Sequence, residues 1–208
     1  MTDISIHKIT VGKWFENTYL LEKNNNVLII DPGDDFTVIN RFIIEHKLKP
    51  IAVINTHGHF DHLGAVKQLK DEYQIEFYIH SKDKRLVSQA NLYRKLAGDN
   101  TLIPTPKIDH FMDAMEHFKL DGFDLQIIQV PGHTEGSVAF SIDNNLFSGD
   151  LLFENSTGRT DLPGGDAAVI KDTIKMVLQR FMGFTLHPGH GASFIIDGDY
   201  MERLKNIF

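Results

Sequence analysis

Residues 56–62 read Thr-His-Gly-His-Phe-Asp-His, a dense group of side chains that bind metal ions. In an extended segment, residues two apart point to the same side, so His57 and His59 can reach one ion together. Asp61 and His62 follow as the chain is expected to turn into a helix, and they would face a second position nearby. Imidazole and carboxylate groups are ligands of zinc and related ions. The segment therefore predicts part of a centre with two metal ions.

One short segment cannot fill two coordination shells, so further ligands are expected elsewhere. Three candidates each follow a predicted strand and adjoin glycine, which permits a sharp turn and a close approach of the backbone. They are His133 after Pro131-Gly132, Asp150 after Ser148-Gly149, and His190 between Gly189 and Gly191.

The remaining sequence predicts strands and helices that place these clusters at strand ends, where α/β folds carry their functional loops. Strands are expected at residues 4–10, 17–22, 26–30, 51–55, 75–79, 125–130, 137–142, 145–147 and 184–186. Helices are expected at residues 36–46, 63–73, 81–97 in two pieces, 167–181 with Asp166 as the cap, and 200–207, with an extended loop at 100–110. Two sheets with helices outside them fit this pattern.

These segments resemble the metallo-β-lactamase fold superfamily, and specifically its glyoxalase II-like branch. The resemblance runs from Ile30-Asp31-Pro32-Gly33 to His190. It implies one α/β domain over residues 1–208, folded as a four-layer αβ/βα sandwich with the metals at one edge of the paired sheets. It also implies a ligand set of His57, His59 and His133 for the first ion, Asp61, His62 and His190 for the second, and Asp150 as the bridge. His187 lacks the flanking glycines of the family pattern and is expected to be structural.

The segment Gly158-Arg159-Thr160-Asp161 resembles the glyoxalase II-like and persulfide dioxygenase branches. True β-lactamases do not usually carry it, and they usually have a signal peptide. Arg159 and Asp161 are therefore candidates for contacting substrate or bracing the site, and burial of both would favour a structural ion pair. Full-length glyoxalase II has a C-terminal helical extension that helps to bind glutathione. Only a short tail follows His190 here, so the resemblance is closer to the shorter bacterial hydrolases.

The expected reaction is hydrolysis of a small thioester of the hydroxyacylglutathione type. Two divalent ions, expected to be zinc with iron or manganese as alternatives, would lower the pKa of a shared water to near neutrality. The thiolate leaving group has a free pKa of ~8.5, so it can depart without a strong general acid. Asp61 is the catalytic candidate for the proton of the attacking water. Asp31 and Thr56 are expected to orient the ligand histidines.

Other functions stay open at this stage. A persulfide dioxygenase would hold one iron through two histidines and a carboxylate, and metal analysis would distinguish it. A hydrolase of another ester, such as a lactone or a phosphodiester, would use the same centre. A catalytically silent metal-binding module is disfavoured, because structural zinc sites are closed and usually mononuclear.

Composition and net charge limit the classes of binding partner and the cellular location that we expect. The net charge of -7 argues against nucleic acid as the main partner, because phosphate binding needs a basic surface. The absence of cysteine excludes disulfides, thiol catalysis and cysteine-ligated zinc. The N-terminus lacks the pattern of a signal peptide, and no apolar stretch is long enough to cross a bilayer. The expectation is a cytoplasmic protein that does not bind membranes, with its oligomeric state left open.

Overall fold

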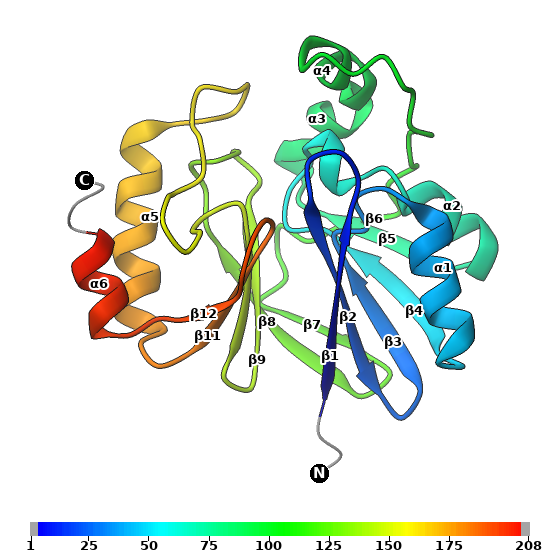
Figure 1. Ribbon diagram of the computed structural model, residues 1–208, viewed down its shortest axis with the longest axis horizontal. Coiled ribbons are helices and arrows are strands. Elements are labelled where there is room, and N and C mark those ends of the chain that lie inside the picture. The colour runs from blue at the N-terminus through cyan, green and yellow to red at the C-terminus, as the bar shows by residue number, and fades with distance from the viewer. Residues whose placement is uncertain (1–3, 205–208) are drawn as a thin grey trace.

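The computed structural model describes residues 4–204, and within that range two mixed sheets face each other with helices on their outer sides (Figure 1). The first sheet has the order β1-β2-β3-β4-β5-β6. Its strands are β1 Ser5–Val11, β2 Glu16–Lys23, β3 Asn26–Ile30, β4 Lys49–Ile54, β5 Glu76–Ile79 and β6 His110–Phe111. The second sheet has the order β12-β11-β10-β9-β8-β7. Its strands are β7 His117–Leu120, β8 Phe123–Gln129, β9 Val138–Ile142, β10 Asn145–Gly149, β11 Thr185–Pro188 and β12 Phe194–Ile195.

Helices connect the parallel strands and cover the outer faces of both sheets (Figure 1). Beside the first sheet lie α1 Phe36–Glu45, α2 Val66–Tyr73, α3 Lys84–Ser88 and α4 Ala90–Leu96, with the short 3-10 turns η1 Phe60–His62 and η2 Ser81–Asp83. Beside the second sheet lie α5 Ala167–Arg180 and α6 Gly198–Leu204. The pairs β3–β4, β4–β5 and β10–β11 are parallel, and each of these pairs is joined by a connection that contains a helix.

Strand β3 shows how the sequence builds the layers. Successive side chains of a strand point to opposite faces. Val27 and Ile29 therefore pack under α1 and α2, whereas Leu28 and Ile30 pack between the two sheets. An uninterrupted apolar run is typical of such a strand, because both of its faces are buried.

Three apolar clusters separate the four layers. One lies under the helices of the first sheet, one lies between the sheets, and one lies under α5 and α6. The predicted four-layer αβ/βα sandwich is confirmed. No helix within residues 4–204 is both long enough and apolar enough to cross a membrane.

Several predicted boundaries differ from the structure. The helix predicted from residue 63 begins at Val66, because the preceding residues turn tightly and the backbone N–H of Ala65 donates to the carbonyl of Pro32. Strand β6 begins inside the predicted loop at 100–110, and β7 and β12 have four and two residues, too few for a clear pattern. The predicted terminal helix at 200–207 begins at Gly198, and residues 205–207 lie outside the described residues.

Two finer predictions are confirmed. The stretch at 81–97 contains two α-helices, α3 and α4, which follow the short 3-10 turn η2. The side chain of Asp166 caps α5 by accepting hydrogen bonds from the backbone N–H groups of Ala168 and Val169.

Candidate metal centre

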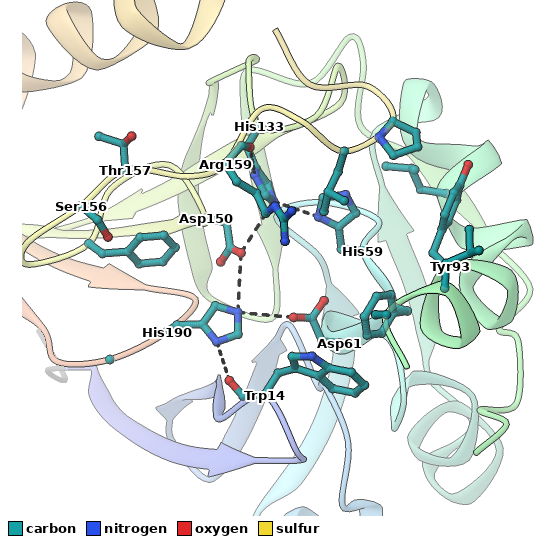
Figure 2. A pocket seen from close by; sticks show the side chains of 18 residues that line it. Trp14, His59, Asp61, Tyr93, His133, Asp150, Ser156, Thr157, Arg159 and His190 are labelled. Atoms are coloured by element: carbon teal, nitrogen blue, oxygen red, sulfur yellow. Dashed lines mark hydrogen bonds and ion pairs between the residues drawn. The ribbon is translucent and has the colours of Figure 1, made fainter. Parts of the chain in front are cut away.

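A pocket of about 870 Å³ opens at the edge where loops from both sheets meet. Figure 2 shows its floor, where His59, Asp61, His133, Asp150 and His190 converge from different loops. The loops that carry these residues follow β4, β8, β10 and β11, so four strand ends supply the floor. The structure brings all seven predicted ligands into this region.

The first group of donors is His57, His59 and His133, whose ligand atoms lie within 4.8 Å of one another. Nδ1 of His59 lies 2.8 Å from Nε2 of His133. Nε2 of His57 is buried and has no hydrogen-bond partner within residues 4–204. Buried polar atoms are nearly always paired, so an unpaired nitrogen aimed at two other imidazoles fits a metal ion.

The second group is Asp61, His62 and His190, and its ligand atoms also lie within 4.8 Å of one another. Nε2 of His190 lies 3.4 Å from Oδ2 of Asp61. Nε2 of His62 is buried and has no hydrogen-bond partner among the described residues. This set of imidazoles and one carboxylate is as suited to a divalent ion as the first group is.

Asp150 lies between the two groups. Its Oδ2 atom is 3.6 Å from Nε2 of His133 in the first group and 3.5 Å from Nε2 of His190 in the second. Its Oδ1 atom is 3.4 Å from Nε2 of His62, and in the part of the chain that the structure describes this buried oxygen has no hydrogen-bond partner. This carboxylate can therefore contribute to both groups at once.

Hydrogen bonds outside the cluster fix which nitrogen of each ring faces inward. Nδ1 of His133 lies 2.8 Å from the carbonyl oxygen of Arg159, and Nδ1 of His190 lies 3.0 Å from that of Trp14. A carbonyl only accepts, so each Nδ1 carries the proton and each Nε2 is left free as a ligand.

Thr56 and Asp31 orient His57 and His62 in the same way. The hydroxyl of Thr56 donates to Oδ2 of Asp31 at 2.6 Å and lies 3.1 Å from Nδ1 of His57. Because that hydroxyl has given its hydrogen to Asp31, it accepts from His57 and leaves Nε2 of that ring free. Asp31 also lies within reach of a ligand position with His57 and His62, but its oxygens accept from the backbone N–H and the hydroxyl of Thr56.

The electrostatics of the cluster favour neutral rings at His57 and His59 and a positive charge at His62. Burial lowers the pKa of His59 to about 3 and holds that of His57 well below its usual value. Burial acts in the same direction on His62, but the carboxylates of Asp150 and Asp31 outweigh it and raise the pKa of this ring well above its usual value. Carboxylates that draw a proton onto a buried ring also draw a divalent ion.

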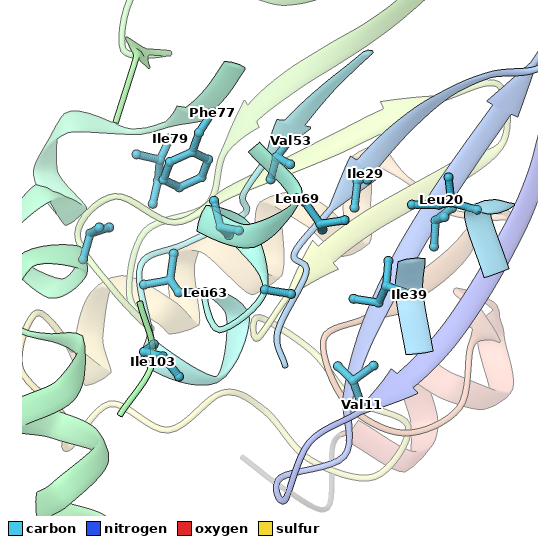
Figure 3. Packing of buried hydrophobic residues seen from close by; sticks show 14 of the residues in the cluster. Val11, Leu20, Ile29, Ile39, Val53, Leu63, Leu69, Phe77, Ile79 and Ile103 are labelled. Carbon is cyan, nitrogen blue, oxygen red and sulfur yellow. The ribbon is translucent and has the colours of Figure 1, made fainter. Parts of the chain in front are cut away.

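Buried contacts hold the loop of residues 56–62 in place. The side chain of Leu63 is fully buried, and Figure 3 shows it pointing into the cluster that also contains Leu69 and Ile79. The side chain of Asn55 donates to the carbonyl of His62 at 2.7 Å. The histidines thus sit on a short turn that is fixed at both ends.

The sequence prediction missed Asp83, which ties two ligand loops together. One oxygen of its buried carboxylate accepts from the backbone N–H of Gly58 at 2.8 Å, and the other accepts from that of Gly136 at 2.9 Å. The hydroxyl of Thr134 donates to it at 2.8 Å. Asp83 therefore holds the loop of His57 and His59 against the loop of His133.

A second missed residue is Glu16, at the start of β2. It is buried beside the second group, and its Oε1 atom lies 3.7 Å from Nδ1 of His62. No residue from 4 to 204 forms a hydrogen bond with this oxygen. Burial raises the pKa of this carboxyl well above its usual value. The strand also pins the loop of His190, because the side chain of Asn17 donates to the carbonyls of Pro188 and Gly191.

Arg159 and Asp161 form a two-pronged ion pair with both bonds at 2.7 Å. Their side chains are 61% and 69% exposed, so the buried structural pair is not what the structure shows. Arg159 lines the pocket, which leaves it accessible to a ligand.

His187 stands apart from the metal groups, as expected. Its two ring nitrogens lie 2.9 Å from the hydroxyl of Ser193 and 2.9 Å from Oδ1 of Asn145. Its ring stacks on Phe147. These contacts give it a structural role between the strands.

Two curated relatives align with most of this chain. The probable metallo-hydrolase YqgX of Bacillus subtilis is 32% identical over 187 residues, which cover 88% of this chain and 89% of the relative. The hydroxyacylglutathione hydrolase GloC of Haemophilus influenzae is 34% identical over 216 residues, covering 99% of this chain and 98% of the relative.

Solved structures agree with these relatives. The BLEG-1 B3 metallo-beta-lactamase has a TM-score of 0.88 at 32% identity, covering 95% of this chain and 97% of that one. TTHA1623, crystallised in a di-iron-bound form, has a TM-score of 0.83 at 35% identity, covering 91% of this chain and 94% of that one. The family model of the metallo-beta-lactamase superfamily matches residues 11–190, which include every donor of the two groups. Sequence, fold and donor geometry lead to the same conclusion: the chain belongs to the metallo-beta-lactamase superfamily.

Proposed function

We propose that this protein hydrolyses thioesters of the hydroxyacylglutathione type at a centre of two divalent ions. One ion would be held by the first group of donors and the other by the second group. The observation that carries the proposal is the position of Asp150, whose carboxylate reaches His133 on one side and His62 and His190 on the other. A mononuclear centre would leave one of these donor groups without a partner.

Zinc is the proposed resident metal, because it accepts imidazole and carboxylate ligands in four- and five-coordinate sites. Iron is the principal alternative, since the related TTHA1623 was crystallised in a di-iron-bound form. The donor set of this chain suits either ion. Metal analysis of protein purified without added metal distinguishes them.

When bound, the two ions supply an acidified water as the nucleophile and polarise the acyl carbonyl of the substrate. The carboxylate of Asp61, which lines the pocket, would accept a proton from that water. The thiolate that leaves has a free pKa of ~8.5, so no side chain of the pocket has to protonate it. Arg159, which also lines the pocket, would contact the thiol carrier.

The thioester assignment is supported by the Haemophilus influenzae relative, whose name is that of a hydroxyacylglutathione hydrolase and which aligns with nearly the whole chain. It is tested by measuring hydrolysis of S-lactoylglutathione by zinc-loaded protein, by chelator-treated protein and by Asp150→Ala. We expect turnover only in the first. A folded protein with two zinc ions per chain that leaves every tested acyl-thiol intact would overturn the assignment. One iron per chain with oxygen uptake on a persulfide would identify a dioxygenase instead.

A β-lactam is the second candidate substrate, because the BLEG-1 relative is named a B3 metallo-beta-lactamase and matches 95% of this chain. The same centre could direct its nucleophile at a strained cyclic amide. A chromogenic cephalosporin assayed beside the thioester distinguishes the two. If the protein hydrolyses the cephalosporin and leaves the thioester intact, the substrate class is the β-lactams.

A further inference from the structure

The pocket has an apolar wall, which consists of Trp14, Phe60, Leu86, Tyr93, Leu96 and Leu162. We propose that this apolar wall is a subsite for the acyl group, so that the preferred thioesters carry an alkyl or aryl acyl chain. The proposal rests on the thioester function above and names the class of its substrate.

The apolar wall lies directly beside the pocket floor, where the metal-donor residues converge. Figure 2 shows Trp14 and Tyr93 on the same side as Asp61, away from Ser156 and Thr157. The rings of Trp14 and Phe60 meet edge to face with their centroids 4.8 Å apart. An acyl group whose carbonyl lies at the floor can therefore extend along a continuous apolar surface.

Leu96 exposes a large apolar side chain inside the pocket. It lines the pocket and is 74% exposed. An exposed apolar side chain in a pocket can contribute to binding, because covering it removes apolar area from water.

The charges of the pocket separate its two sides. Among the described lining residues outside the pocket floor, Arg159 is the one charged side chain, and it follows Ser156 and Thr157 in the same loop. Thiol carriers such as glutathione and coenzyme A are polar and charged, so this side suits the carrier. The six side chains of the apolar wall are themselves uncharged, which suits the acyl group.

A buried arginine holds the apolar wall in place. Arg94 is 5% exposed and forms ion pairs with Asp34 at 2.9 Å and Asp99 at 3.0 Å. Its guanidinium carbon lies 5.2 Å from the centre of the Trp14 ring. Helix α4 and the β1–β2 turn are thus fastened together without substrate, which reduces the cost of ordering on binding.

The first test compares acetyl, butanoyl, hexanoyl and octanoyl thioesters of one thiol carrier. We expect kcat/KM to rise about twofold to fourfold with each added methylene until the wall is covered. In Leu96→Ala the ratio of octanoyl to acetyl turnover should fall about fivefold or more. Leu92→Ala is the matched control, because Leu92 is 51% exposed on the same helix but does not line the pocket, and its ratio should be unchanged.

The second test needs no turnover. Trp14 is the one tryptophan of the chain, so intrinsic fluorescence reports on the apolar wall. Butanoate and octanoate, the acids that hydrolysis would release, are titrated into zinc-loaded protein. We expect a blue-shifted emission and a lower Kd for octanoate, because the chain displaces water from the indole.

The outcomes separate the two proposals. An enzyme that hydrolyses the acetyl thioester with a flat chain-length profile, and whose emission ignores octanoate, overturns the acyl subsite and leaves the thioester function standing. A different result is that no thioester is cleaved, that octanoate still shifts the emission, and that Leu96→Ala weakens octanoate binding. That result overturns the thioester function and supports the apolar subsite.

Discussion

Oδ2 of Asp31 lies 3.1 Å from Nδ1 of His62, a ring that is completely buried. The contact turns the opposite nitrogen of the ring toward Asp150. Asp31 itself has a left-handed backbone with φ of 49°, a conformation that aspartate tolerates better than most residues. A residue at the end of β3 thus sets the direction of a donor on another loop.

Replacing Asp31 by Asn should weaken binding at the second metal position. The amide can present an N–H to the protonated Nδ1 of His62, so two donors would face each other and the ring would turn. Loss of such an outer partner typically costs about 10-fold to 100-fold in metal affinity. Competition with a zinc chelator measures the change. Asp143→Asn is the control, because Asp143 has a φ of 50° on an exposed hairpin. Equal affinity in both variants would contradict this orienting role.

Gly189→Ala should damage the centre by steric contact alone. A Cβ atom at this position would lie 2.2 Å from Oδ1 of Asp150 and 2.7 Å from Cε1 of His62. We expect a folded protein whose zinc affinity falls by about 10-fold or more, because both donors must shift. The measurement is zinc stoichiometry after dialysis. Gly198→Ala is the control, since a Cβ there meets nothing within 4 Å, and a fully zinc-loaded Gly189→Ala protein would refute the prediction.

Asp83→Ala should lower both stability and metal binding. It leaves the backbone N–H groups of Gly58 and Gly136 and the hydroxyl of Thr134 without their acceptor in a buried region. Each unsatisfied buried donor costs about 1–3 kcal/mol, so we expect the free energy of unfolding to fall by about 3 kcal/mol or more. Urea unfolding of the metal-free protein gives this value. A loss of under about 1 kcal/mol would show that water replaces the carboxylate.

His187 should make the stability depend on pH. Burial lowers its pKa to about 4 from the usual 6.5, so the unfolded chain takes up a proton at a higher pH than the folded protein does. Its contribution is fully present above pH 6.5 and is lost as the pH falls toward about 4, with a maximum of about 3 kcal/mol.

His187→Gln should therefore flatten the fall in unfolding free energy over this pH window. Both proteins are compared after chelator treatment, so that the histidines of the metal centre contribute equally. An unchanged slope would show that His187 titrates normally in the folded protein.

Local patterns predicted two sheets with helices outside them and the candidate donor segments, whereas the four-layer arrangement and the grouping of the donors came from the resemblance to the family. The apolar run of β3 indicates a strand buried on both faces, and it packs in that way. Each donor segment follows a predicted strand, and the strand ends meet at one edge. Glycine beside a donor also carries information, since Gly189 lies where any side chain would strike Asp150.

Asp83 and Glu16 could not be predicted by the same reasoning. Asp83 follows β5, as the donors follow other strands, but two of its partners are backbone N–H groups, which any residue can provide. Glu16 lies in a strand whose neighbouring residues are also polar and buried, so alternation could not show which way it points. Their roles depend on distances between segments far apart in the chain.

The donors are divided between the two halves of the molecule. His57, His59, Asp61 and His62 belong to the half built on the first sheet, whereas His133, Asp150 and His190 belong to the half built on the second. Neither half alone supplies all three members of either donor group, so we expect tight metal binding only after the two halves have docked. Ions bound there would link the two halves and stabilise their docked arrangement. Metal content would then distinguish the fully docked protein from one whose halves have not docked.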